Sequence, residues 1–198
     1  MNIDFTTIDH NVPCPDDIVD VIPTKSGIYG WYYNFEILKD FTNNQAKIKK
    51  KLFDISKKLK SPEFRTILGA KFGNVFKGEV EHISQFKEKD IDERIDALSE
   101  DEIKAMLSIL QNFTQPLYIG IAKNLKERYS THYKSIQENI CDVDRRKGKC
   151  FGHRIQQQDI KIEELVYKYQ VLDTMERSNI EKIEYIANRF FKPIFGRR

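Results

Sequence analysis

Three short segments rich in aromatic and β-branched residues constrain the fold more than any other feature of this 198-residue chain. They are GIYGWYY at 27–33, LYIGI at 117–121 and LVYKYQVL at 165–172, and each has the composition of a β-strand. Helical patterns follow the second and third segments, over 124–137 and from Asp173 to Pro193. The sequence therefore predicts an α/β fold with a small three-stranded mixed sheet flanked by helices.

The first two predicted strands are separated by a long interval, 34–115, of roughly 80 residues. Apolar residues recur at helical spacing over 45–60, and a less regular helical pattern with an acidic surface covers 81–98. Ser99 and Glu102 form a capping box that opens a further helix. We expect a mostly helical insertion within a single domain that spans 1–198.

Charge is gathered in blocks, although the net charge is only +3. The net charge is about +8 over 39–77, about −7 over 79–102 and about +5 over 118–158. The small net charge therefore hides two basic regions, and their distribution indicates an anionic partner better than the sum does.

The cysteine count and the start of the chain bear on location. Cys14, Cys141 and Cys150 are an odd number at irregular spacing, which argues against a disulfide framework and fits a reducing cytoplasm. The acidic, polar start lacks the apolar segment of a signal peptide. No segment approaches about 18 consecutive apolar residues, so no membrane span is expected.

One acidic residue stands where the last predicted helix should be apolar. At about 100° per residue, Ile180, Ile183, Ala187 and Phe191 form one stripe, and Glu184 falls in its middle. A buried carboxylate needs a cation, a metal or an opening to solvent. A salt-bridged or snorkelling glutamate at the edge of the stripe is the alternative.

The helix predicted over 124–137 has a similar feature, because Arg128 and His132 lie one turn apart on its apolar side. Arginine offers a fixed fork for a phosphate, histidine transfers a proton near neutral pH, and glutamate ligates a hard cation. Together with Glu184, these residue types suggest phosphodiester chemistry.

The first two predicted strands carry the tripeptides Gly27-Ile28-Tyr29 and Tyr118-Ile119-Gly120. In these motifs the sequence resembles the GIY-YIG nucleases. The similarity continues through YIGIAKNLKER at 118–128, which ends in the family's catalytic arginine, and reaches Glu184, nine residues before Pro193. It covers 26–33 and 117–196. A histidine one turn after the arginine, as at His132, is similar to the type II restriction endonucleases of the family.

Two positions depart from the family pattern. Gly196 stands where the family usually has a supporting asparagine, and Asn188, one turn after Glu184 on the same predicted helix, is a candidate to replace it. Ile121 stands where many members have a lysine, a role that falls to Lys123.

The resemblance implies one-step hydrolysis of a DNA phosphodiester with one Mg2+ (or Mn2+) ion. Tyr29 would orient or deprotonate the attacking water, and Tyr118 would hold the phosphate or assist that proton transfer. Arg128 would stabilise charge on the phosphoryl oxygens, and Glu184 would bind the metal. His132 would either hydrogen-bond a tyrosine hydroxyl or act as base. Because the ordinary pKa of tyrosine is near 10, a base role needs a nearby cation. Plain strand packing is the alternative for either tyrosine alone.

Basic residues outside the motifs are the expected contacts with DNA backbone: Lys123, Arg145, Arg146, Lys147, Lys149 and Arg154. The basic helix at 47–60 either contacts DNA with its outer face, which we favour, or pairs with the acidic block at 79–102. Cys141, Cys150 and His153 have zinc-like spacing in part, but the paired short spacings of a zinc finger are missing, so ordinary loop residues are favoured.

The leading hypothesis is a sequence-specific type II restriction endonuclease that acts on double-stranded DNA. A homodimer is expected, because a double-strand cut by a one-metal site needs two copies. A non-catalytic DNA-binding or regulatory protein of the same fold, and a structure-specific repair nuclease, are the alternatives.

Overall fold

The computed structural model describes residues 5–9, 19–59, 65–68, 76–79, 93–137 and 150–196. Its strands are β1 Thr6–Asp9, β2 Gly27–Tyr33, β3 Arg65–Leu68, β4 Phe76–Glu79, β5 Tyr118–Ala122 and β6 Leu165–Val171. Its helices are η1 Phe35–Phe41, α2 Gln45–Lys58, α4 Glu100–Phe113, α5 Leu125–Gln137, α6 Phe151–Gln157, η2 Ile162–Glu164 and α7 Arg177–Phe191, where η marks a 3-10 helix.

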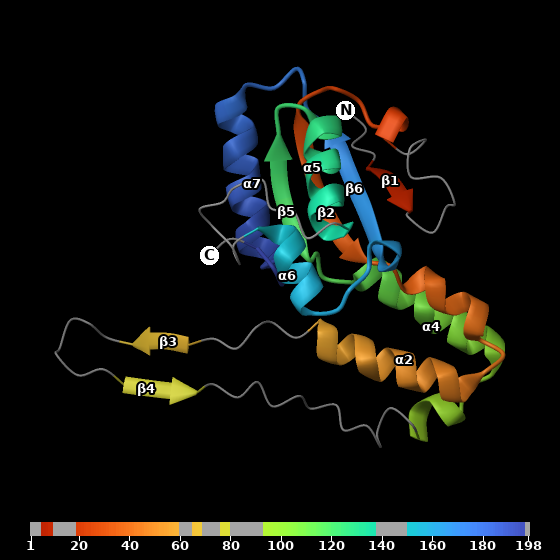
Figure 1. Cartoon of the computed structure of the whole chain (residues 1–198). Helices are drawn as coiled ribbons and strands as arrows, with labels where there is room; N and C mark the ends of the chain where they lie inside the picture. The colour runs from red at the N-terminus through yellow and green to blue at the C-terminus, as the bar shows by residue number, and fades with distance from the viewer. Residues whose placement is uncertain are drawn as a thin grey trace.

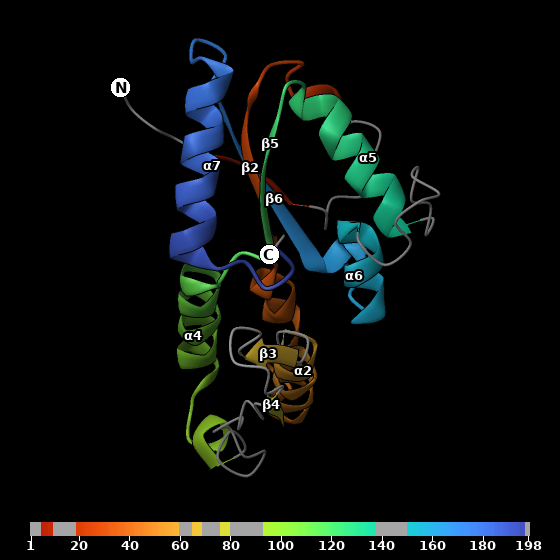
Figure 2. The same cartoon turned by 90° about the vertical axis from the view of Figure 1, so that its left-hand side faces the viewer.

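The main sheet separates two helical layers. Figures 1 and 2 show α7 along one face of the sheet and α5 with α6 on the other, while α2 and α4 lie beyond its lower end. The chain is thus an α/β structure, as predicted.

The prediction of a three-stranded mixed sheet is wrong in two respects. The sheet has four strands in the order β1-β6-β2-β5, and every neighbouring pair is antiparallel. The fourth strand, TTID, is short and polar, so its own sequence carries little strand signal. β5 and β6 run in the same direction, but β2 lies between them, and therefore no parallel ladder forms.

Local sequence signals account for several helix boundaries. The predicted capping box is confirmed, because the Ser99 side chain accepts from the Glu102 backbone and Glu102 reaches back to the Ser99 backbone. Asn124 accepts a hydrogen bond from the Glu127 backbone nitrogen at 3.1 Å, as its position before α5 suggests. The last helix begins at Arg177, so Asp173 does not cap it. The Asp173 carboxylate instead forms an ion pair with Lys25.

The interval between β2 and β5 holds η1, α2 and α4, together with a β3-β4 hairpin that periodicity did not predict. Of the helix expected over 81–98, residues 93–96 are helical and 81–92 lie outside the described residues. Lys49 of α2 forms an ion pair with Asp96, so the basic and acidic blocks do pair at this point.

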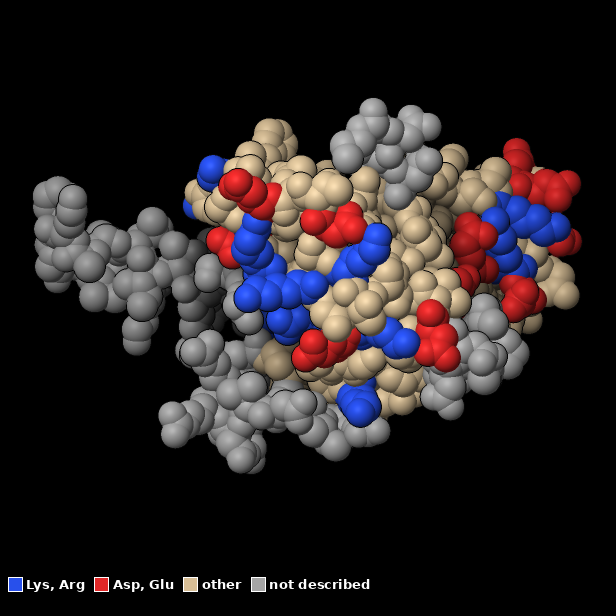
Figure 3. Space-filling model, turned by 90° about the horizontal axis from the view of Figure 1, so that it is seen from above, with Lys and Arg blue, Asp and Glu red and all other residues tan. Residues whose placement is uncertain are grey.

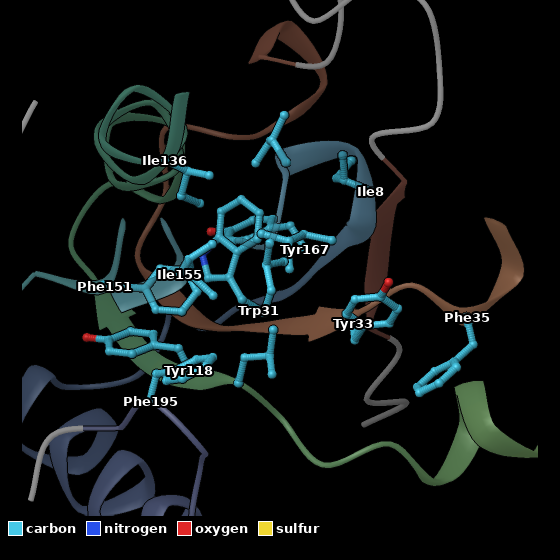
Figure 4. Close-up of a cluster of buried hydrophobic side chains, with 14 of the residues drawn as sticks. Ile8, Trp31, Tyr33, Phe35, Tyr118, Ile136, Phe151, Ile155, Tyr167 and Phe195 are labelled. Atoms are coloured by element: carbon cyan, nitrogen blue, oxygen red, sulfur yellow. The ribbon is translucent and has the colours of Figure 1, made fainter. Parts of the chain in front are cut away.

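The two faces of β2 are buried differently, as the alternation of a strand requires. Ile28 packs with Ile119, Ile121 and Ile180 beneath α7. Trp31, which is fully buried, belongs to the larger core on the α5 and α6 side, where Figure 4 shows it among aromatic and aliphatic side chains. This aromatic face is where the predicted site residues of both strands lie.

Candidate active site

The pairing of β2 with β5 brings the two motif tyrosines together. Tyr29 lies opposite Gly120 and Trp31 lies opposite Tyr118, so all three aromatic side chains share one face. The ring centroids of Tyr29 and Tyr118 are 6.0 Å apart. Both side chains are buried, with Tyr29 only 2% exposed.

Gly120 makes this arrangement possible. A Cβ at this position would lie 2.7 Å from the Tyr29 Oη and 2.8 Å from a ring carbon of Tyr118. Any side chain there would collide with both rings, which explains in steric terms why the second motif has glycine at this position.

His132 projects from α5 onto the tyrosine pair. Its Nε2 is 3.4 Å from the Tyr29 Oη, and the Trp31 Nε1 donates a hydrogen bond to its Nδ1 at 3.1 Å. The imidazole lies edge-on to both motif tyrosines, with ring centroids 5.5 Å from each. Each ring nitrogen of His132 therefore has a contact that orients the imidazole, and the side chain is buried.

Burial dominates the protonation of Tyr29. It raises the pKa of Tyr29 well above the ordinary value, and the neighbouring Tyr118 raises it further, while the positive charge of Arg128 lowers it. A base role for Tyr29 needs a cation that lowers this pKa, and in the described structure burial outweighs the effect of Arg128. Tyr29 is a neutral phenol at neutral pH unless a ligand or metal changes its surroundings.

Arg128 lies at the solvent side of this cluster. It is one helical turn before His132 on α5, and its side chain is exposed. Its charge lowers the pKa of both Tyr29 and Tyr167, so the guanidinium acts electrostatically on the buried hydroxyls. An exposed guanidinium beside buried hydroxyls is accessible to an incoming phosphate.

Glu184 is on α7, which packs on the opposite face of the sheet. The predicted stripe is partly wrong, because Ile183 and Phe191 are 36% and 57% exposed. The side of the helix that faces the sheet carries Ile180, which is buried, and Glu184, Ala187 and Asn188, which are half-buried. Because α7 packs on the face opposite the tyrosine cluster, the described structure does not bring Glu184 together with Tyr29, Tyr118 and His132.

Asn188 was the candidate to replace the family asparagine that is missing at Gly196. Its side-chain nitrogen donates to the Glu184 backbone oxygen at 2.9 Å, so the amide is engaged within its own helix. It supports the backbone at Glu184 and does not extend toward the tyrosines through this bond.

Glu184 is the one residue that the sequence assigned to a metal ion. Within the described ranges, no group of three or more His, Cys, Asp and Glu residues could hold a metal ion. Magnesium is commonly bound by one or two carboxylates, with waters and substrate phosphate completing its shell. Glu184 is half-buried and supplies one carboxylate, so any ion held there would need waters or a substrate phosphate as its other ligands.

The zinc alternative fails at Cys150. This cysteine is disulfide-bonded, so its sulfur is not a thiolate, and it accepts a hydrogen bond from the His153 backbone at the start of α6. The His153 Nε2 contacts the Gln157 amide at 3.0 Å. The disulfide also weakens the cysteine argument for a reducing compartment. Cys14 and Cys141 lie outside the described residues.

The predicted DNA contacts are only partly described. Lys123 is exposed in the turn between β5 and α5. Arg154 is half-buried on α6, and its Nη1 donates to the Gly196 backbone oxygen at 3.1 Å, so it ties the C-terminal turn to α6. The cluster of Arg145, Arg146, Lys147 and Lys149 lies outside the described residues.

The upper end of the molecule carries both signs of charge. Figure 3 shows Lys and Arg side chains grouped there with Asp and Glu beside them. Near this end, Lys25 pairs with Asp173, Lys126 with Asp20 and Arg177 with Glu181, each at 2.9 Å. These pairs partly neutralise the basic side chains.

Two aromatic residues of the cluster were not singled out from the sequence. Trp31 hydrogen-bonds His132, and Tyr167 of β6 lies opposite Trp31 with its ring centroid 5.5 Å from that of Tyr29. The buried Tyr167 hydroxyl has no hydrogen-bond partner among the described residues, which is the kind of group that an ordered water satisfies. Trp31 is two residues after Tyr29, and Tyr167 is two residues before Tyr169. This spacing, which places both members of a pair on one face of a strand, is the only sequence signal for them.

Two further findings complete the description. The helices within the described ranges are too short or too polar to cross a membrane. In comparisons with protein-family models, curated proteins and solved structures, nothing matches this chain.

Proposed function

We propose that this chain is a Mg2+- or Mn2+-dependent DNA endonuclease, and that it cleaves double-stranded DNA at specific sequences as a type II restriction enzyme does. One observation carries the proposal: Tyr29, Tyr118 and His132 come from three different elements and meet in one cluster, with Arg128 at its solvent side. These residues, together with Glu184, also carry the resemblance to the GIY-YIG nucleases.

Plain packing of aromatic side chains is a weaker explanation of this cluster. A packing role needs no polar group, and burying one has a cost unless it is hydrogen-bonded. His132 is buried with contacts to a hydroxyl at one nitrogen and an indole donor at the other. We infer that this buried imidazole, oriented by two contacts near the exposed Arg128, belongs to a site that handles protons and anions.

The residues divide the reaction as follows. Arg128 would stabilise the charge that develops on the phosphoryl oxygens, and Tyr118 would hold the phosphate. Tyr29, a neutral phenol in this structure, would orient the attacking water through its hydroxyl. Glu184 would hold the divalent ion, which when bound supplies electrostatic stabilisation of the phosphate.

Exposed lysines on two parts of the molecule would contact the DNA backbone. Lys123 is exposed beside the N-terminal end of α5, and the exposed lysines of α2 are Lys47, Lys50 and Lys57. Such contacts give affinity without sequence information, and the base contacts remain to be identified. A homodimer would place two such sites on opposite strands, and a cytoplasmic location would follow from action on cellular DNA.

The test is incubation of purified protein with unmethylated plasmid and phage DNA, in Mg2+ and in EDTA. Discrete, Mg2+-dependent fragments are the expected result, and sequencing of their ends gives the recognition site. A nicked product or a smear would instead indicate a repair-like nuclease. Intact DNA that is retarded on the gel would contradict cleavage and favour a DNA-binding or regulatory protein.

A further inference from the structure

Trp31 determines which nitrogen of His132 carries the proton. The indole Nε1 can only donate a hydrogen bond, and it lies 3.1 Å from the His132 Nδ1. The acceptor Nδ1 must therefore carry a lone pair. The neutral imidazole that satisfies this bond has its single proton on Nε2.

The protonated nitrogen is the one that faces the motif tyrosine. Nε2 lies 3.4 Å from the Tyr29 Oη, so in this tautomer its N–H is directed at the phenol oxygen. A donor at that oxygen favours negative charge on it, whereas the doubly protonated imidazole would put an N–H against the Trp31 donor. The contact is long for a hydrogen bond, as catalytic contacts often are before substrate binds.

The indole itself is held on several sides. Trp31 is fully buried and stacks on Tyr129 of α5 with an interplanar angle of 11°. Its ring centroid lies 5.0 Å from that of Tyr167 and 5.9 Å from that of Phe151. A ring enclosed in this way keeps its N–H in one direction, which is the requirement for fixing a tautomer.

We propose that Trp31 is a positioning residue for the nuclease reaction, which holds His132 in the Nε2–H tautomer so that His132 donates to the Tyr29 oxygen and does not act as the base. This inference rests on the proposed function. It chooses between the two roles that the sequence left open for His132, and it adds a residue that neither signature tripeptide contains.

The chain offers a selective test, because it contains only one tryptophan. Replacing all tryptophan by 3-benzothienylalanine changes residue 31 alone and substitutes sulfur for the N–H in a ring of nearly the same shape. Replacement by 4-fluorotryptophan keeps the N–H and is the matched control. Circular dichroism and the thermal midpoint of each protein report whether the fold is retained.

Two readouts separate this inference from the proposed function. Long-range 1H–15N spectra of 15N-histidine protein give the tautomer of each of the four histidines, and a His132→Gln sample assigns the signal. Single-turnover cleavage of DNA gives the rate. We expect Nε2–H for His132 in the native and fluorinated proteins, and a mixture of tautomers with a rate lower by about 10- to 100-fold in the benzothienyl protein.

Three results would overturn the inference. They are an Nδ1–H or a doubly protonated His132 in the native protein at neutral pH, an unchanged tautomer in the benzothienyl protein, and a changed tautomer with an unchanged cleavage rate. If the native protein does not cleave DNA at all, the proposed function fails, while the spectra still decide whether Trp31 fixes the tautomer.

Discussion

Replacing Glu184 by glutamine is expected to lower the single-turnover rate of DNA cleavage by about 10³-fold or more, because several kcal/mol of charge stabilisation are lost with the metal carboxylate. The affinity for DNA in Ca2+ should change less than about twofold, since backbone contacts by lysine and arginine supply most of it. Gel-shift titration and single-turnover cleavage measure the two quantities separately. Glu184 is half-buried on α7, and glutamine preserves its size.

Glu181→Gln is the matched control for this variant. Glu181 lies on the same helix, is exposed, and forms an ion pair with Arg177 at 2.9 Å. Exposed pairs of this type contribute little to stability, so cleavage and binding should both stay near wild type. Equal loss of binding and cleavage in Glu184→Gln, or unchanged cleavage, would show that the metal-binding role is wrong.

Gly120→Ala is the second substitution with a large expected effect. The new Cβ would lie 2.7 Å from the Tyr29 Oη, and the Tyr29 ring cannot retreat easily because Tyr118, His132 and Tyr167 surround it. Overpacking should reduce the free energy of unfolding by about 1–3 kcal/mol. Displacement of the hydroxyl should lower cleavage by about 10²-fold. Urea unfolding and the cleavage rate at a temperature where the variant is folded provide the measurements.

Gly30→Ala controls for the loss of a glycine from the same sheet. Gly30 is the next residue after Tyr29 and faces away from the cluster, where its Cβ would meet the half-buried Tyr32 ring at 3.0 Å and the Tyr118 backbone oxygen at 3.3 Å. That ring can shift into solvent, so cleavage should fall much less than in Gly120→Ala. Similar losses of cleavage in the two variants would mean that general damage to the sheet, and not the position of Tyr29, explains the effect.

Local signals in the sequence predicted most of the central elements. The aromatic runs became β2 and β6, and Ser99 and Asn124 cap the helices that follow them. β1 was missed because Thr6–Asp9 becomes a strand only by pairing with β6, more than 150 residues away in the sequence. The antiparallel order of the sheet was also missed, since it depends on β2 lying between β5 and β6.

The sequence predicted which residues meet in the candidate site, but it did not predict their contacts or their protonation. Tyr29, Tyr118 and His132 do lie together, but the Trp31–His132 bond joins residues 101 positions apart and no local pattern reveals it. The burial that raises the pKa of Tyr29 is likewise a property of the assembled core. The rotation of α7, which exposes Ile183, depends on how the helix packs against β5.

The most direct measurement of the central claim compares wild type with Tyr29→Phe on a radiolabelled duplex that contains the site found in the plasmid assay. Phenylalanine keeps the buried ring and removes only the hydroxyl that faces His132. The account predicts Mg2+-dependent cleavage by wild type, a rate lower by about 10² to 10³-fold in the variant, and equal affinity of the two proteins for the duplex. Cleavage by Tyr29→Phe at the wild-type rate would contradict an active site built on this tyrosine.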